Sequence, residues 1–223
     1  MDKTIKLNTT AYSLLGLLSK KSWSAYELTE FMGLSVIKFI LPRSRSQLYS
    51  EPKKLAELGL ITLTKEVRQG RERSLFDITP EGRRVFDEWL QQPGENLKVE
   101  YKSLLKFYLQ HSSDTPALRK RISEMRAQTL ADIHEALSHI SHILDEGIIF
   151  QQTAAAASMT TQFGVNQFKA RLAWLDSVDH WLQQMPNQDE IENWALARYQ
   201  ESHQQLMQLV EQYDEQPNSR GDL

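Results

Sequence analysis

The segment that most limits how this chain can fold runs from Ser44 to Gly59 and reads SRSQLYSEPKKLAELG. Ser44 and Gln47 have the spacing of a capping box, in which two side chains satisfy free backbone N–H groups at the start of a helix. Gly59 stands where a left-handed residue ends a helix, with Leu55 and Leu60 as the apolar pair of a Schellman motif. The sequence therefore predicts one short helix with two defined ends.

This helix has an apolar side and a polar side. Leu48, Leu55 and Leu58 recur at spacings that place them on one face, which we expect to pack into a core. Side chains at or near the other face are of the kinds that bind DNA, namely Arg45, Gln47, Tyr49, Lys53 and Lys54. An amphipathic helix of this kind predicts a nucleic-acid contact.

Pro52 interrupts this pattern, because a proline inside a helix removes one backbone hydrogen bond at a cost of about 3 kcal/mol. Two structures accommodate it. Either one continuous helix bends at Pro52, or a first turn ends and a new helix begins with Ser50 as its N-cap. We prefer the bent helix.

Two further helices precede this segment and a hairpin follows it. Residues 9–20 are apolar over more than half of a helix circumference, so this helix must be covered on two sides. Ser24 and Glu27 form a second capping box, which opens a helix that ends at Gly33. Together with the apolar connection at 34–43, these elements form an array like a helix-turn-helix.

Alternating apolar residues predict two strands on either side of the turn Arg68-Gln69-Gly70-Arg71, the second strand starting at Ser74. The tip of this hairpin holds Arg68, Arg71 and Arg73 against the single acid Glu72. Such a tip can lie along a phosphate backbone or enter a minor groove, or it is simply a solvated basic turn. Thr79, Pro80 and Glu81 then predict the start of a helix that ends before Pro93.

Charge divides the chain into two parts. Residues 1–92 hold 15 Lys and Arg against 11 Asp and Glu, a net charge of +4, whereas the remainder has a net charge of −7. This asymmetry suggests a DNA-binding module joined to an acidic module with another task. The chain has no cysteine for disulfide or thiolate chemistry, no apolar run of membrane-spanning length and no signal peptide, so we expect a cytoplasmic protein.

The sequence of the acidic part, after residue 92, predicts a set of helices. After a helix at 101–111, residues 116–147 carry apolar residues at nearly heptad spacing. About 30 residues at 1.5 Å each span about 45 Å, which is too long to bury inside so small a domain. This helix therefore predicts a partner helix and a homodimer. Residues 148–161 are a loop or the start of the next helix, a last helix runs to about Gln212, and a polar tail follows.

Several short motifs carry a resemblance to a known family. They are YSLLGLLS at 12–19, SAYEL at 24–28, SQLYSEPKKLAELGLI at 46–61, GRERSLFDIT at 70–79 and PEGR at 80–83. With the order helix, helix, helix, basic hairpin, helix, residues 9–92 resemble the PadR family of bacterial winged-helix transcriptional regulators. The resemblance implies a mainly α fold with a small β-hairpin wing: a winged helix-turn-helix domain at 1–92 and an α-helical dimerisation domain at 93–213. The polar composition of residues 214–223 predicts a disordered tail.

The function that this resemblance implies is sequence-specific binding of double-stranded DNA. The expected protein is a repressor that binds a two-fold operator as a homodimer through its C-terminal helices. The resemblance also permits a response to a small aromatic effector. Its expected DNA contacts are Ser24, Tyr26, Arg45, Ser46, Gln47, Tyr49, Lys53 and Lys54, with Arg71 and Arg73 on the wing. The alternative is a helical adaptor for other proteins, which keeps the winged-helix fold without binding DNA.

Other chemistry is poorly supported. His139, His142 and Glu146 could share a helix face, but histidines so spaced on a polar surface are usually solvated, so no metal is predicted. No catalytic or phosphate-binding motif is present, so we predict no enzyme and no cofactor. The aromatic residues of the acidic part either enclose an aromatic effector or form ordinary core and dimer contacts; they are Tyr101, Tyr108, Phe168, Trp174 and Trp181.

Overall fold

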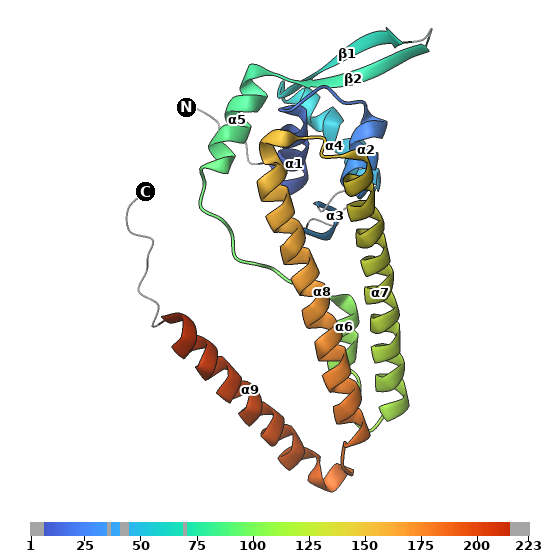
Figure 1. Cartoon of the computed structure of the whole chain (residues 1–223), viewed down its shortest axis with the longest axis vertical. Coiled ribbons are helices and arrows are strands. Elements are labelled where there is room, and N and C mark those ends of the chain that lie inside the picture. Colours follow the sequence, from blue (N-terminus) through green and yellow to red (C-terminus); the bar gives the residue numbers. More distant parts are fainter. Residues whose placement is uncertain (1–6, 35–36, 41–44, 69–70, 215–223) are drawn as a thin grey trace. The chain divides into compact units, whose positions relative to one another are not determined.

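A computed structural model describes residues 7–34, 37–40, 45–68 and 71–214, which form mostly helices and one antiparallel hairpin (Figure 1). In the first part of the chain the elements are α1 (Thr9–Leu18), α2 (Ala25–Leu34), α3 (Ile37–Ile40), α4 (Arg45–Glu57), β1 (Ile61–Arg68), β2 (Arg71–Ile78) and α5 (Pro80–Leu90). The rest contains α6 (Lys102–Tyr108), α7 (Thr115–Glu146), η1 (Gln151–Thr153), α8 (Ala154–Gln183), η2 (Gln188–Glu190) and α9 (Ile191–Asp214). The predicted fold class, mainly α with a hairpin wing, is confirmed.

Local hydrogen bonds explain where the first helices begin. The side chain of Asn8 caps α1 by accepting a hydrogen bond from the Ala11 N–H at 2.9 Å. The second predicted capping box is present, since Glu27 N–H donates to Ser24 Oγ at 3.2 Å and Ser24 N–H donates to Glu27 Oε2 at 2.8 Å. The other predicted box includes Ser44, which lies outside the described residues.

Helix α4 runs through Pro52 without a break, so the alternative of a new helix starting at Ser50 is wrong. Ser50 does not cap a helix start, because its hydroxyl donates to the carbonyl of Gln47 at 3.2 Å, one turn back. Pro52 is almost fully buried, at less than 2% exposed. Burial of the proline ring offsets part of the cost of the hydrogen bond that a proline cannot make.

The predicted Schellman motif ends α4. Leu60 N–H donates to Leu55 O at 3.0 Å, Gly59 N–H donates to Ala56 O at 3.0 Å, and Gly59 has a φ of 71°. Leu58 corrects one prediction, because it is 46% exposed and does not face the core. The chain reverses at Gly59, and Leu60, which is fully buried, packs into the core instead.

One apolar cluster joins the elements of the winged helix. Its largest fully buried side chains come from α1, α2, α4 and the segment that leads into β1, and they are Leu14, Leu15, Leu28, Leu55, Leu60 and Ile61. Helix α1 is buried on more than one side, as its wide apolar surface predicted.

The hairpin pairs β1 with β2 in a register that runs from Ile61 opposite Ile78 to Arg68 opposite Arg71. Strand β2 therefore begins at Arg71, before the predicted start at Ser74. A short backbone bridge attaches the hairpin to the segment before α2: Trp23 N–H donates to Phe76 O at 3.2 Å, and Phe76 N–H donates to Trp23 O at 2.8 Å. This bridge gives the wing a fixed base beside α2.

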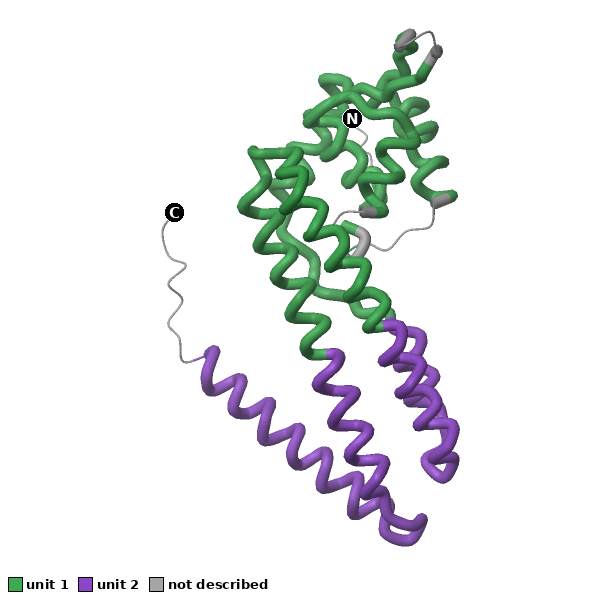
Figure 2. Tube along the Cα trace, turned by 45° about the vertical axis from the view of Figure 1, so that its right-hand side comes forward, with its two compact units in different colours: residues 1–100, 129–170 green, residues 101–128, 171–223 purple. Residues whose placement is uncertain are grey.

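The chain divides into two compact units, Met1–Glu100 with Thr129–Ala170 and Tyr101–Gln128 with Arg171–Leu223 (Figure 2). The first unit contains the winged helix and the parts of α7 and α8 nearest to their connection. The predicted domain boundary between residues 92 and 93 stays a prediction, because compactness does not say which segment folds alone.

Within the first unit, Phe150 joins the winged-helix core from far along the chain. Its ring centroid lies 5.9 Å from that of Trp23 and 5.5 Å from that of Phe31. Phe150 follows Gly147, whose φ of 87° turns the chain at the end of α7. The connection between α7 and α8 is thus packed against α2 and the segment before it.

The second unit has its own core, in which α7 and α8 face one another through Leu118, Ile122, Met125, Leu175, Val178 and Leu182. Arg126 of α7 donates to Asp176 at 2.7 Å and to Asp179 at 3.3 Å, both on α8. The 32 residues of α7 confirm the predicted long helix. Helix α8 begins at Ala154, and α9 reaches Asp214; residues 215–223 lie outside the described residues.

Candidate nucleic-acid interface

Helix α4 presents its polar side to solvent. Ser46, Gln47, Tyr49, Lys53 and Lys54 are exposed, whereas Leu48 and Leu55 are buried on the opposite side. Arg45 is the first residue of α4, and its side chain lies outside the described part of the structure. The predicted amphipathic character of this helix is confirmed, and its exposed side offers amide, hydroxyl and ammonium groups to a partner.

The two lysines of α4 differ in their surroundings. Lys54 Nζ lies 3.4 Å from Glu51 Oε2, and its side chain remains 61% exposed. Glu51 is buried and its other carboxylate oxygen accepts a hydrogen bond from Asn8 Nδ2 at 2.9 Å, which links α4 to the start of α1. Lys53 is exposed. Both lysine side chains are thus exposed, and that of Lys54 also contacts the buried carboxylate of Glu51.

The start of α2 is the second place where predicted contacts lie. Ser24 is half-buried in its capping box, and Tyr26 is 65% exposed. Helices α2 and α4 pack against one another, so these residues and the exposed side of α4 belong to one module.

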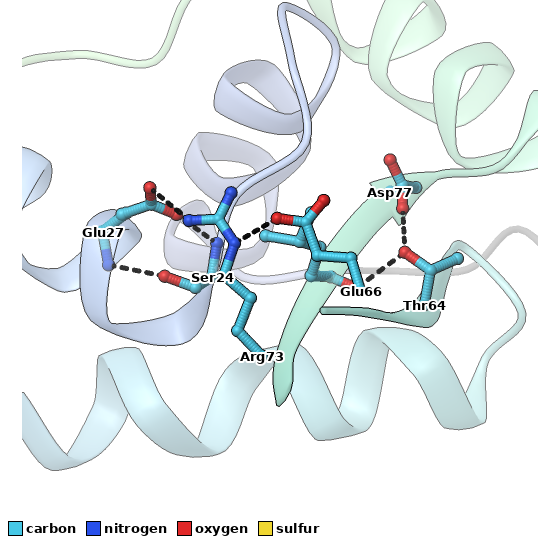
Figure 3. Close-up of polar contacts among 7 residues, drawn as sticks. Ser24, Glu27, Thr64, Glu66, Arg73 and Asp77 are labelled. Carbon is cyan, nitrogen blue, oxygen red and sulfur yellow. Dashed lines mark hydrogen bonds and ion pairs between the residues drawn. The ribbon is translucent and has the colours of Figure 1, made fainter. Parts of the chain in front are cut away.

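On the wing, the guanidinium of Arg73 is held by two carboxylates of the protein (Figure 3). Its Nε donates to Glu66 Oε1 on β1, and its Nη1 lies 3.4 Å from Glu27 Oε1 on α2. The hydrogen bond with Glu66 is the main reason that the pKa of Arg73 is raised. That Arg73 binds DNA stays a prediction, as it does for Arg71, whose side chain lies outside the described part of the structure.

The sequence reasoning did not find Glu27 and Glu66 as partners of Arg73. A signal for Glu66 existed, because strand pairing that sets Arg68 opposite Arg71 also sets Glu66 directly opposite Arg73. No comparable signal existed for Glu27, which is 46 residues from Arg73 in the chain.

Glu27 is ionised more readily than an ordinary glutamate. Partial burial alone would raise its pKa, but hydrogen bonds from Ser24 and the positive charges of Arg73 and Lys21 outweigh this effect, so the pKa is lowered from 4.5. The carboxylate is thus charged throughout the neutral range. It can act as a permanent acceptor at the start of α2.

The base of the wing has a second polar attachment. The hydroxyl of Ser22 donates to Asp77 Oδ1, and Thr64 Oγ1 donates to Asp77 Oδ2 at 2.8 Å. Asp77 therefore connects β1 and β2 to the segment before α2. Figure 3 shows its contact with Thr64.

Comparisons with known proteins agree with this geometry. A family described as "Winged helix DNA-binding domain" matches residues 26–92. The negative transcriptional regulator PadR of Bacillus subtilis (strain 168) is 27% identical over 177 residues, which are 75% of this chain and 93% of that protein. By these matches the chain is similar to PadR-like transcriptional regulators. Such regulators are a non-enzymatic kind of protein.

Solved structures show the same fold for this PadR-like chain. A PadR-like transcriptional regulator from Bacillus cereus has a TM-score of 0.65 at 23% identity, covering 80% of this chain and 100% of that one. Bacillus subtilis PadR in complex with operator DNA also has a TM-score of 0.65, at 20% identity, covering 78% of this chain and 99% of that one. The likeness extends well beyond the winged helix into the helical part.

The aromatic residues proposed from sequence as an effector site divide between the units. Tyr101, Trp174 and Trp181 pack against the core of the second unit, and Tyr108 is 79% exposed. Phe168 belongs to the first unit, where it lines a cavity of about 20 Å³ beside His139, room for roughly one water molecule. The structure thus uses most of these residues as core.

Metal and membrane features were also sought among the described residues. They contain no group of three or more His, Cys, Asp or Glu side chains able to hold a metal ion. Within the same ranges, every helix is too short or too polar to cross a bilayer.

Proposed function

We propose that this PadR-like regulator represses transcription in the cytoplasm by binding a two-fold operator as a homodimer. The observation that carries the proposal is the exposed polar side of α4, next to a hairpin wing, in a fold shared with PadR bound to operator DNA. In helix-turn-helix docking, such a helix enters the major groove and reads base edges with its N-terminal part.

Binding to DNA is tested by mobility shift on genomic fragments in a salt series. Phosphate contacts release counterions, so a DNA-binding protein loses affinity steeply as salt rises. We expect a steep slope and selection of specific fragments. The alternative, an adaptor that binds only other proteins, would retard no fragment at any salt concentration, and this result would overturn the proposal.

Gln47 is the residue to test for base reading. It lies in the first turn of α4. From there a glutamine side chain can form two hydrogen bonds with one adenine, donating to N7 and accepting from the N6 amino group. Gln47→Ala should weaken operator binding by about 1–3 kcal/mol and leave random-DNA binding nearly unchanged. Equal losses on both DNAs would mean that Gln47 only supports the helix. Lys53→Ala and Lys54→Ala serve as comparison variants, each lowering the salt slope by about 1 whatever the sequence.

Helix α9 supports the homodimer. Five of its apolar residues, spaced by 3, 7, 4 and 3 positions, are more than half exposed, from 51% to 73%; they are Leu196, Tyr199, Leu206, Val210 and Tyr213. A second copy would cover this face, as heptad-like spacing favours. Light scattering should give twice 25.9 kDa. A monomer at micromolar concentration would overturn both the homodimer and recognition of a two-fold operator.

Two relatives bear on the sign of regulation. The curated Bacillus subtilis relative is a negative regulator. The Vibrio cholerae virulence activator AphA shares the fold at a TM-score of 0.56 and 21% identity, covering 79% of this chain and 98% of that one. We favour repression because the negative regulator has the higher identity. A reporter driven by the bound promoter should rise when this protein is deleted, and a fall would indicate an activator.

A small aromatic effector is the finer part of the proposal. Bacillus subtilis PadR has been solved in complex with p-coumaric acid, and that structure has a TM-score of 0.59 at 20% identity, covering 80% of this chain and 99% of that one. Adding p-coumaric acid to this protein should change its tryptophan fluorescence and release operator DNA. If neither quantity changes up to millimolar concentration, this acid is not its effector.

A further inference from the structure

The wing is attached to α2 and the segment before it at three successive levels. At its base, Asp77 accepts hydrogen bonds from Ser22 and Thr64. The backbone bridge between Trp23 and Phe76 comes next. Arg73 makes the third attachment, nearest to the tip of the hairpin, to Glu27 of α2.

The third attachment differs from the others in charge. One guanidinium meets two carboxylates, since Arg73 contacts Glu66 across the hairpin and Glu27 on α2 (Figure 3). The three side chains together carry a charge of −1, so the positive charge of Arg73 is compensated within the protein. The Arg73 side chain is only 33% exposed. These surroundings disfavour a phosphate ligand.

Glu27 serves two elements at once. Its Oε2 accepts the Ser24 N–H at 2.8 Å and so defines the first turn of α2, while its Oε1 faces Arg73 at 3.4 Å. The same carboxylate therefore fixes the start of α2 and the position of the wing beside it. Because α2 also packs on α4, α2 sets the position of the wing relative to the exposed side of α4.

We propose that Arg73 acts in operator binding as a positioning residue, which holds the wing beside α2 through Glu27 so that wing and α4 meet DNA together. This inference rests on the proposed binding of DNA. It replaces the role of a phosphate contact that the sequence suggested for Arg73, and it leaves that role to Arg71 near the tip of the hairpin.

Glu27→Gln distinguishes a positioning role of Arg73 from a phosphate contact, because the two roles predict changes of opposite sign in operator affinity. Glutamine also satisfies a capping box at this position, so the variant keeps the start of α2 and removes only the charge that faces Arg73. If Arg73 bound phosphate, losing a nearby negative charge would leave DNA binding unchanged or strengthen it. A positioning role predicts the opposite, a loss of operator affinity of about two- to fivefold.

Glu57→Gln is the matched control. It removes the same charge from the last residue of α4, which is exposed and lies apart from the wing attachments in the sequence. Operator affinity of this control should equal or exceed that of the wild type. An equal loss in both variants would overturn the proposal.

Arg73→Gln and Arg71→Gln give a second, independent comparison. Loss of a phosphate contact lowers the slope of log affinity against log salt by about 1. We expect this change for Arg71→Gln only, whereas Arg73→Gln should reduce affinity at every salt concentration with the wild-type slope. A slope lowered by about 1 in Arg73→Gln would overturn the positioning role.

Amide hydrogen exchange of the free protein reports on the wing itself. Exchange across residues 61–78 should accelerate in Glu27→Gln and Arg73→Gln but not in Glu57→Gln, because the attachment near the tip is lost. Unchanged exchange would overturn the proposal. If the wild type binds no DNA, the proposed function fails, while the exchange result still tests the attachment. If Glu27→Gln does not fold, the salt slope of Arg73→Gln decides.

Discussion

Helix α4 and helix α9 have similar apolar spacing but opposite surroundings. On α4, Leu48 and Leu55 are 6% and 1% exposed, because α1, α2 and the hairpin close over them. On α9, Leu206 and Val210 are 62% and 53% exposed within a single chain. The comparison teaches that an apolar stripe specifies only that a helix must be covered. Whether the same chain or a second one covers it depends on the neighbours that the chain supplies.

The largest effect should come from the closed core. Leu55→Ala removes side-chain volume from a fully packed site and should lower the free energy of unfolding by about 2–5 kcal/mol. Urea denaturation followed by circular dichroism measures the change. Leu58→Ala, three residues on but half-exposed, is the control and should change stability by less than about 1 kcal/mol. Similar losses in the two variants would contradict the closed core described for α4.

The second prediction concerns the open face of α9. Leu206→Ala with Val210→Ala should weaken the proposed self-association by about 1–3 kcal/mol for each copy, because truncating residues at the centre of an interface has effects of this size. Sedimentation at graded concentration should show the variant dissociating where the wild type does not. The stability of the winged helix in the monomer should stay unchanged. If the variant associates as the wild type does, another surface holds the dimer.

Phe150 tests how far the winged-helix core depends on a residue outside it. Phe150→Ala should lower the free energy of unfolding by about 1–3 kcal/mol, less than for a fully buried phenylalanine since this ring is only partly buried. Trp23 and Phe31 would lose one of their aromatic neighbours, so near-ultraviolet circular dichroism should also change. Phe163→Ala, on the half-exposed surface of α8, is a suitable control.

The smallest expected effect is a difference in the pH at which His139 on α7 and Glu27 beside the wing lose their contributions to the free energy of unfolding. Burial, helped by the charge of His142, lowers the pKa of His139 on α7 below 6.5, so the neutral form is favoured in the folded state. The stabilisation is complete above pH 6.5 and is lost as pH falls through the lowered folded pKa. For Glu27, with its pKa lowered from 4.5, the loss should begin only below pH 4.5.

A pH series of urea denaturation, combined with hydrogen exchange, separates these two ranges. His139→Gln should remove the part of the pH dependence just below pH 6.5 and keep the part below 4.5, and Glu27→Gln should do the reverse. If His139→Gln leaves the profile unchanged, the histidine titrates alike in the folded and unfolded chain.

The sequence by itself determined where several elements begin and end. The capping box of Ser24 with Glu27 and the Schellman motif at Gly59 follow from hydrogen bonds between residues at most five apart in the chain. The length of α7 followed from its apolar period, whereas the PadR-like fold was implied by the resemblance of several short motifs, in this order of elements, to that family. Local chemistry decides such features, because the groups that interact are already neighbours before the chain folds.

Only the tertiary structure decided which distant groups meet. Glu27 contacts Arg73 from 46 residues away. Phe150 packs beside Trp23 from beyond the end of α7, and Pro52 is buried inside a continuous α4. Leu58 was predicted to lie in the core, but the turn at Gly59 gives that place to Leu60. The spacing of residues in the sequence determines which of them lie on the same face of a helix or strand. Which residues that face contacts depends on how whole elements pack.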